Sequence, residues 1–169
     1  MNEVPLEFIL LTPLNWEQWK AHVLEDEVQY PESLQTSEEE YAHMLKALPN
    51  ASFVLLYQNQ YAGNCIIKCL GAEDWVDLHM EDLSLPEGVY YLHNYSVSGV
   101  FQGKGLGQKM FAHLLQHLRS LGVKELWGHF RPNASLNNAL KVGAIRVREE
   151  PNWYETGETF TLCKIPLVF

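Results

Sequence analysis

The sequence is poor in basic residues and in cysteine, and it has no long apolar run. Twelve Lys and Arg residues stand against 21 Asp and Glu residues, so the formal net charge is −9 in a chain of 169 residues. This acidic balance argues against nucleic acid as a ligand, because the DNA or RNA backbone needs a basic surface. The length suits a single domain with its own hydrophobic core, which we expect to span residues 1–169.

Neither a targeting leader nor a membrane segment is expected. The N-terminal residues Met1–Pro5 carry no basic residue, and the apolar run Phe8–Leu11 is too short for either kind of segment. The three cysteines, Cys65, Cys69 and Cys163, are odd in number and lie in strand-like segments. We therefore expect free, buried thiols in the cytoplasm and no disulfide framework.

Charge is distributed unevenly along the chain. Residues 1–88 hold 16 acidic and 3 basic side chains, whereas residues 89–169 hold 5 acidic and 9 basic side chains. A mildly basic second half favours a polyanionic cofactor, and an acidic first half favours a cationic partner such as an amine. For any single carboxylate, the simpler explanation is that an acidic surface keeps the protein soluble.

Hydrophobic periodicity predicts an α/β protein with a mixed sheet and helices on both faces. An Asn at position 15 and the capping-box pattern from Ser37 mark the starts of the first two helices. Residues 71–88 carry six acidic and no Lys or Arg residues, and we expect a long loop or a partly ordered excursion there. A hairpin turn is expected at Asn59-Gln60. The predicted strands are 5–12, 53–57, 61–70, 89–97, 123–130, 144–149 and 159–168, and the predicted helices are 15–27, 38–48, 105–121 and 133–142.

The glycine-rich stretch 102–107 (QGKGLG) lies between a predicted strand and a strongly amphipathic helix. Glycine lets the backbone turn tightly, adopt positive φ and approach a ligand closely. The helix that follows presents unpaired amide N–H groups and the positive end of its dipole to this turn. Together these features predict a phosphate-binding site.

Two common phosphate motifs do not fit this stretch. A P-loop needs four residues between its first Gly and its Gly-Lys pair, and Gly99 is only three residues before Gly103. Gly105 also replaces the hydroxyl residue that would hold magnesium. A dinucleotide fingerprint that starts at Gly103 would need glycine at position 108, where the chain has Gln108.

What fits is Arg/Gln-x-x-Gly-x-Gly/Ala, matched by Gln102, Gly105 and Gly107 five residues after Val97. This pattern resembles the coenzyme A pyrophosphate loop of the GNAT family of N-acetyltransferases. Residues 132–144 are similar to the family's second motif, although Asn133 is one place late and Ala144 replaces a usual Phe. Residues 151–158 resemble an Asn-Tyr-Tyr segment of several members.

The resemblance covers nearly the whole chain, although the first 88 residues match in element order only. It implies the acyl-CoA N-acyltransferase fold, a mixed and mostly antiparallel sheet of about seven strands with helices on both faces. It also implies that residues 1–88 serve the acceptor and residues 89–169 bind acetyl-CoA, with no metal. Whether the chain forms a homodimer stays open. The residues implied to bind the coenzyme are Tyr95, Ser96, Val97, Gln102, Gly103, Lys104, Gly105, Leu106, Gly107, Gln108 and Asn133.

Within this set, the backbone of Tyr95, Ser96 and Val97 is implied to pair with the pantetheine arm. The Val97 N–H would polarise the thioester carbonyl. The amides from Gly103 to Gln108 would hold the pyrophosphate.

For the catalytic base, the resemblance to arylalkylamine-type members points to His93. The ordinary pKa of histidine, about 6.5, suits proton removal near neutrality. Period-two geometry places Tyr91, His93 and Tyr95 on one face of the strand, barring a bulge. Tyr91 occupies the place of a second family histidine and could orient a water. The alternative is that His93 is a half-buried strand residue without a catalytic role.

The general acid is less defined, because no tyrosine occurs in residues 133–143, where many members carry one. Tyr154 is the nearest substitute, or else a packing aromatic. A thiolate can also leave without an acid. The pair His113 and His117 has the i, i+4 spacing of zinc ligands but no third ligand, so a solvated helix face is expected.

The sequence therefore favours an acetyl-CoA-dependent N-acetyltransferase that acts on a small-molecule or peptidyl amine by direct transfer. The alternative is a non-catalytic acyl-CoA-binding or regulatory module on the same fold. A nucleotide-phosphate enzyme is disfavoured by the P-loop mismatch. The sequence leaves the identity of the amine open.

Overall fold

The computed structural model describes residues 4–167 and contains one seven-stranded sheet with the order β1-β2-β3-β4-β5-β7-β6. All neighbouring strands are antiparallel except β4 and β5, which are parallel. The fold class expected from the sequence is confirmed. The strands are β1 Leu6–Leu10, β2 Phe53–Tyr57, β3 Gln60–Cys69, β4 Tyr90–Val97, β5 Glu125–Phe130, β6 Ile145–Glu150 and β7 Phe160–Pro166.

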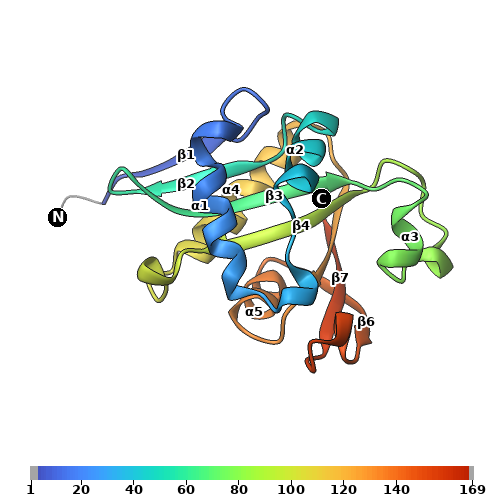
Figure 1. The fold of residues 1–169 in the computed structure, drawn as a ribbon. Helices are drawn as coiled ribbons and strands as arrows, with labels where there is room; N and C mark the ends of the chain where they lie inside the picture. Colours follow the sequence, from blue (N-terminus) through green and yellow to red (C-terminus); the bar gives the residue numbers. More distant parts are fainter. Residues whose placement is uncertain (1–3, 168–169) are drawn as a thin grey trace.

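Helices cover both faces of the sheet (Figure 1). The helix pair α1 Trp16–Asp26 and α2 Glu38–Ala47 packs on the face that carries Val54 and Ile66. On the opposite face, α4 Leu106–Ser120 and α5 Ala134–Lys141 pack against Phe53, Leu55 and Ile67. Alternate residues of β2 therefore enter different cores, as strand geometry requires. The remaining helical segments are α3 Asp74–Asp77, η1 Glu27–Gln29, η2 Glu32–Leu34, η3 Glu81–Leu83, η4 Gly99–Phe101 and η5 Trp153–Glu155.

The expected element boundaries agree with the structure to within about two residues, and Val168, at the end of the predicted last strand, lies outside the described residues. The capping box is present, with the Ser37 side chain accepting from the Glu40 N–H. Asn15 stands at the helix start, but its side chain does not cap the helix. Its Oδ1 instead accepts from the Thr12 N–H at 2.8 Å and its Nδ2 donates to the Leu10 carbonyl, so it closes the turn after β1.

One further expectation needs correction, and the alternative left open for residues 71–88 is decided in favour of a partly ordered excursion. The hairpin turn is Gln58-Asn59, one residue earlier than predicted, and Gln60 already pairs with Tyr57. Both turn residues have positive φ, 52° and 63°, which matches the twist of a two-residue hairpin. The acidic stretch 71–88 is ordered around α3 and η3 and projects to one side of the sheet (Figure 1).

Candidate active site

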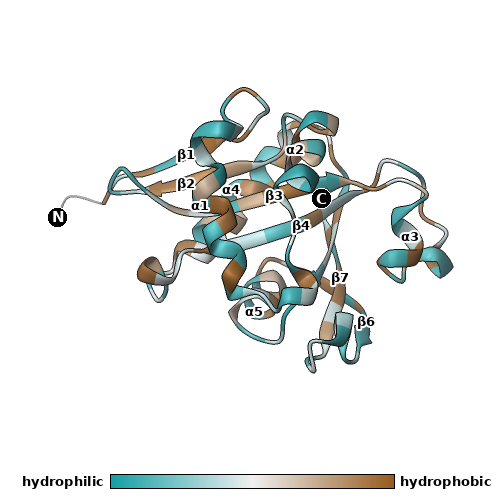
Figure 2. Ribbon diagram, in the orientation of Figure 1, coloured by the Kyte–Doolittle hydropathy of each residue, from teal (hydrophilic) through white to brown (hydrophobic). Residues whose placement is uncertain are grey.

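The parallel strands β4 and β5 separate after a short paired segment. Their only backbone pairs are Tyr90 with Leu126 and Tyr91 with Trp127, although β4 continues to Val97 and β5 to Phe130. Beyond these pairs, β4 keeps its antiparallel partner β3 on one edge only. The stretch 93–96 of β4 is hydrophilic, in contrast to β2 (Figure 2). The centre of the sheet therefore contains a polar strand edge that no neighbouring strand covers.

Backbone groups of Tyr95 and Val97 face this uncovered edge. The Ser98 N–H donates to the Ala62 carbonyl of β3 at 2.8 Å, and successive residues of a strand point their backbone groups to alternate sides. Consistent with this, side chains from outside the sheet donate hydrogen bonds to the carbonyl groups of both residues. Tyr30 Oη donates to the Tyr95 carbonyl at 2.9 Å, and Gln102 Nε2 donates to the Val97 carbonyl at 3.1 Å. The backbone of Ser96 faces β3 instead.

A β-bulge in β4 decides where the side chains point. The register with β3 passes from Asn94 opposite Ile66 to Leu92 opposite Ile67, so His93 is the extra residue. His93 contacts Thr36 and Tyr41 on the α2 side, whereas the Tyr95 ring packs edge-on against Phe111 of α4. The expectation that Tyr91, His93 and Tyr95 share one face is therefore wrong for Tyr95, because the bulge shifts the alternation.

The glycine-rich loop turns directly into α4, which begins at Leu106. Gly103 and Gly105 have φ of +81° and +73°, and no atom lies within 4 Å of where a Cβ would be at either position. Gly107 has a different requirement, because a Cβ there would lie 2.7 Å from Tyr95 Oη. No side chain caps the helix start, so its first amide N–H groups point into the loop. The loop and the helix start, here called the glycine cradle, have the geometry that was expected for binding an anion.

Of the other predicted coenzyme contacts, Lys104 belongs to the loop itself and Asn133 to the start of α5. Lys104 Nζ lies 5.9 Å from the centre of the Tyr57 ring, and a cavity of about 510 Å³ adjoins it, lined also by Leu106 and Lys109. Asn133 caps α5, because its Oδ1 accepts from the Ser135 N–H at 2.9 Å.

A larger cavity of about 650 Å³ lies beside the bulge, between the segment that joins α1 to α2, α2 itself, α3, β4, β5 and the β6–β7 connection. It brings together the predicted side chains His93, Tyr91 and Tyr154, with Tyr95 at its edge. The residues of the glycine-rich loop, Ser96, Val97 and Asn133 do not line it. Carboxylates at its wall are Glu27, Glu39, Glu40, Asp74 and Asp77.

His93 is held in a neutral form at the α2 side of this cavity. Its Nε2 is 2.8 Å from Thr36 Oγ1, and its ring meets the Tyr41 ring edge-on. Burial, with a further contribution from Lys68, lowers the pKa of His93 to about 4. His93 can therefore accept a proton near neutrality without carrying a resting charge, but it is a weaker base than an exposed histidine.

Glu27 is a cavity residue that the sequence did not single out. Its side chain is buried, with 5% of the residue exposed, and accepts from the Thr36 N–H at 2.9 Å and from the Tyr41 hydroxyl. Burial, together with the charges of Glu40 and Asp26, raises the pKa of Glu27 to about 7. It follows a regular helix as one acidic residue among several, and no local pattern indicates its burial.

His129 is the second residue that sequence reasoning missed. It lies on β5 with its Nδ1 2.7 Å from Tyr91 Oη, and its ring stacks on Trp153 at 4.0 Å. Burial, with the nearby Arg148 and His79, lowers the pKa of His129 to about 3. Period two in β5 places Trp127 and His129 on one face, and this was the only sequence signal available.

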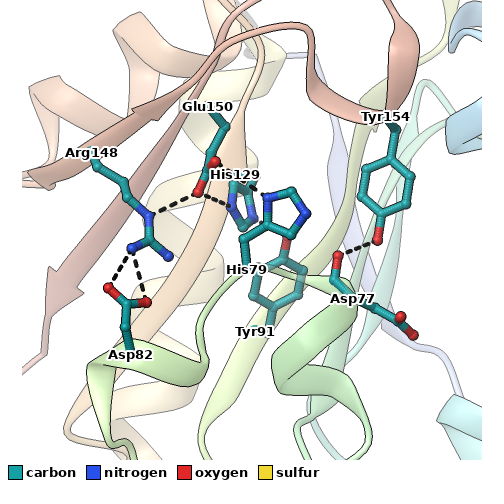
Figure 3. Close-up of polar contacts among 8 residues, drawn as sticks. All are labelled: Asp77, His79, Asp82, Tyr91, His129, Arg148, Glu150 and Tyr154. Carbon is teal, nitrogen blue, oxygen red and sulfur yellow. Dashed lines mark hydrogen bonds and ion pairs between the residues drawn. The ribbon is translucent and has the colours of Figure 1, made fainter.

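Tyr154 closes the rim of the cavity from the β6–β7 connection. It has a positive φ of 48°, and its hydroxyl donates to the Asp77 carbonyl at 2.5 Å (Figure 3). Burial raises the pKa of Tyr154, and the charge of Asp77 raises it further by a smaller amount. The hydroxyl is thus committed to a contact between the acidic excursion and η5.

The two histidines of α4 that have the spacing of zinc ligands pack against other parts of the fold. His113 is not on a solvated face as expected, because its ring stacks on Phe8 at 3.9 Å, and His117 contacts the Asn50 carbonyl at 2.6 Å. Among residues 4–167, no group of three or more His, Cys, Asp or Glu side chains could hold a metal ion. Within the same residues, no helix is long and apolar enough to span a bilayer. Cys65 and Cys163 are buried free thiols, whereas Cys69 is only half-buried.

Comparison with known proteins agrees with this geometry. A sequence model of the acetyltransferase (GNAT) family matches residues 11–152. No curated protein matches the chain.

Solved structures with the same fold have low sequence identity. A Drosophila melanogaster polyamine N-acetyltransferase is 13% identical with a TM-score of 0.77, covering 96% of this chain and 100% of that chain. The Escherichia coli ribosomal-protein-S18-alanine N-acetyltransferase is 19% identical with a TM-score of 0.72, covering 98% and 96%. A structure of the NatC complex bound to Gag peptide and CoA includes a chain that is 16% identical with a TM-score of 0.76, covering 96% and 99%.

Proposed function

Because the chain belongs to the acetyltransferase (GNAT) family of acyltransferases, we propose that it transfers an acetyl group from acetyl-CoA to a primary amine of a small molecule or peptide. One observation carries this proposal. The uncovered edge of β4 runs directly into the glycine cradle at the start of α4, so a single extended ligand can meet both. Coenzyme A has this form, with a peptide-like arm that ends in a diphosphate.

The residues present fit such a ligand. The positive-φ glycines leave open space where side chains would stand, and the helix start supplies unpaired N–H groups for a diphosphate. We assign the diphosphate to the amides of Gly103 to Gln108 and the arm to the backbone of Tyr95 and Val97. Gln102, Lys104 and Asn133 are proposed as further contacts.

An arm that pairs with β4 must replace side chains now bonded there. Tyr30 Oη holds the Tyr95 carbonyl, and Gln29 Nε2 lies 3.4 Å from the Val97 carbonyl, which also accepts from Gln102. Each of these hydrogen bonds contributes about 1 kcal/mol. Their exchange for coenzyme hydrogen bonds is therefore close to neutral.

For the acceptor, the charges of the cavity favour a cationic amine. Lys68 is paired with Asp74 at 2.6 Å, and Arg131 is paired with Glu158 at 2.8 Å. Among the described residues, no ion pair offsets the carboxylates of Glu39 and Asp77 at the cavity wall. A protonated amine is attracted to such a wall before it loses its proton.

We propose that His93 takes the proton from the attacking nitrogen, and that Tyr91 orients this exchange. Glu27 is a second candidate, favoured because its pKa of about 7 matches proton transfer at neutral pH better than the value of about 4 for His93. The pH profile of kcat/KM separates them. A limb near pH 7 that disappears in Glu27→Gln assigns the proton to Glu27, and a limb that disappears in His93→Gln assigns it to His93. Tyr154 is proposed to protonate the departing thiolate, after release from Asp77.

We further propose that residues 1–88 serve the acceptor and residues 89–169 the coenzyme within one domain. The cytoplasm is the proposed compartment, since the three cysteines are free thiols. The sequence and the fold leave a homodimer open.

The test combines calorimetry with acetyl-CoA and a thiol-release assay across an amine panel. Heat of binding together with release of free thiol supports the proposed N-acetyltransferase activity. Heat of binding without turnover on any amine instead supports a non-catalytic acyl-CoA-binding module. Absence of binding contradicts both.

A further inference from the structure

Four titratable side chains, Tyr91, His129, Glu150 and His79, lie next to one another in that order (Figure 3). Tyr91 Oη lies 2.7 Å from His129 Nδ1, His129 Nε2 lies 3.9 Å from Glu150 Oε1, and Glu150 Oε2 lies 3.5 Å from His79 Nδ1. Tyr91 lines the cavity. The exposed fraction of the side chain rises along the row, from 1% for His129 to 12% for Glu150 and 62% for His79. The row therefore leads from a dry interior to solvent.

The protonation of His129 follows from its neighbours. Its Nε2 is buried and has no hydrogen-bond partner, and the Glu150 carboxylate lies 3.9 Å from it. A ring nitrogen that faces a carboxylate is stabilised by carrying the proton. Nδ1 is then the acceptor, so Tyr91 donates to it. In this tautomer Tyr91 and His129 both point their protons outward, from Tyr91 to His129 and from His129 to Glu150.

The surroundings of the row hold its members in place. The His129 ring stacks on Trp153 of η5 and lies between Tyr91 on β4 and Glu150 on β6. Arg148, also on β6, donates its Nε to Glu150 Oε1 at 2.8 Å and its Nη1 to Asp82 at 2.7 Å. Asp82 and His79 both belong to the acidic excursion. The excursion is thus anchored where the row reaches the surface.

Acetyl transfer to an ammonium releases one proton per turnover. The protonated amine and acetyl-CoA give the amide, free CoA thiol and one H⁺: the nitrogen–carbonyl bond forms and the carbon–sulfur bond breaks. The amine loses two protons in all, one of which ends on the thiolate. The other must leave a cavity that substrate and coenzyme fill.

We propose that Tyr91, His129, Glu150 and His79 conduct this released proton from the cavity to solvent. The inference rests on the proposed function. The Tyr91 oxygen receives a proton from the cavity as its own proton passes to His129 Nδ1, and the Nε2 proton passes to Glu150. His79 then exchanges the proton with water. His129 is neutral before and after a passage, which suits a buried ring that disfavours a resting positive charge. The passage leaves the ring proton on Nδ1, and the reverse passage restores the Nε2 tautomer once the product has left and water enters the cavity. The 3.9 Å step requires a small approach of Glu150, as catalytic contacts do on closure.

The kinetic test uses Glu150→Gln, which keeps size and acceptor capacity but cannot take a proton. Glu149→Gln is the matched control, since Glu149 is an exposed neighbour on the same strand. We expect kcat to fall by about tenfold or more in Glu150→Gln with KM little changed, and to recover with added imidazole as an external proton carrier. The surface variant His79→Ala should show a smaller, imidazole-rescued loss without affecting the fold. If Glu150→Gln matches Glu149→Gln in kcat, or if its loss is not restored by imidazole, the relay is wrong.

A second readout does not depend on turnover. The ¹⁵N shifts of the His129 ring report its tautomer directly. The relay requires a proton on Nε2 in the parent, with a shift change in Glu150→Gln and none in Glu149→Gln. A proton on Nδ1 overturns the relay whether or not the protein is active. If no amine in the panel releases thiol while the Nε2 tautomer and its response to Glu150→Gln are found, the proposed function fails and the arrangement of the row stands.

Discussion

The buried carboxyl of Glu27 predicts an unusual pH dependence of stability. Its pKa rises from an ordinary 4.5 to about 7 on folding, mainly because burial disfavours the charged form. The folded state therefore holds this proton more tightly than the unfolded state does. Stability contributed by the protonated form is fully present below about pH 4.5 and is lost as the pH rises through about 7. Glu27→Gln removes the ionisation and keeps one acceptor oxygen, for the Thr36 N–H, while its NH2 group replaces the oxygen that faces the Tyr41 hydroxyl.

The magnitude follows from the size of the shift. A change of one pKa unit corresponds to about 1.4 kcal/mol. Between about pH 5 and about pH 8, ionisation of Glu27 should cost the parent roughly 2–3 kcal/mol of unfolding free energy relative to the variant. The variant should therefore match the parent approximately at the lower pH and be more stable at the higher pH. His93 and His129 have the opposite effect, because their lowered pKa values make the free energy of unfolding decrease as the pH falls below about 6.5. This effect is the same in variant and parent, so it cancels in the difference between them.

Urea unfolding followed by tryptophan fluorescence measures this difference at a series of pH values. Glu32→Gln is the control, because Glu32 is exposed and also lies between α1 and α2. Glu32→Gln should change the free energy of unfolding by the same small amount at every pH. The reasoning about Glu27 is refuted if the stability difference between Glu27→Gln and the parent does not grow with pH, or if Glu32→Gln shows the same growth.

Three shorter predictions concern catalysis, the glycine loop and the thiols. His93→Ala should lower kcat at neutral pH by about 10²-fold with little effect on acetyl-CoA affinity, and a parent-like kcat and pH profile would remove its catalytic role. Gly105→Ala and the control Gly88→Ala both place a side chain at positive φ and should each cost about 1–2 kcal/mol in urea unfolding, but only Gly105→Ala should weaken acetyl-CoA in calorimetry. Equal affinities in the two variants would argue against the cradle. Cys69 should react with a thiol reagent before Cys65, whose complete burial raises its pKa, and the reverse order by peptide mapping would contradict the fold in this region.

Several elements show which structural features a local sequence pattern can predict. The Ser37 capping box and the glycine loop at α4 were predicted at their observed positions, because both depend on residues within one turn of one another. The Asn15 side chain was wrongly expected to cap α1, since the turn after β1 offered it competing partners. The hairpin turn was off by one residue for a similar reason: neither of its residues is glycine, although both take positive φ.

The sequence predicted only some of the residues of the candidate site. Tyr91, His93 and Tyr154 line one cavity, yet their hydrogen-bond partners lie 38 to 77 residues away along the chain. The bulge that turns Tyr95 away from His93 involves a register with β3, which no property of β4 alone reveals.

What the amino-acid sequence determined by itself was the order of elements, the α/β class and the position of the glycine-rich turn at the start of α4, because periodicity, caps and glycine geometry act over a few neighbouring residues. Only the tertiary structure decided which ionisable groups are buried together. Glu27, Glu150 and His129 are ordinary residues in sequence, and they become chemically distinct because the fold removes water from around them and places a partner beside each. Desolvation and pairing depend on segments far apart in the chain, and therefore appear only once those segments are packed.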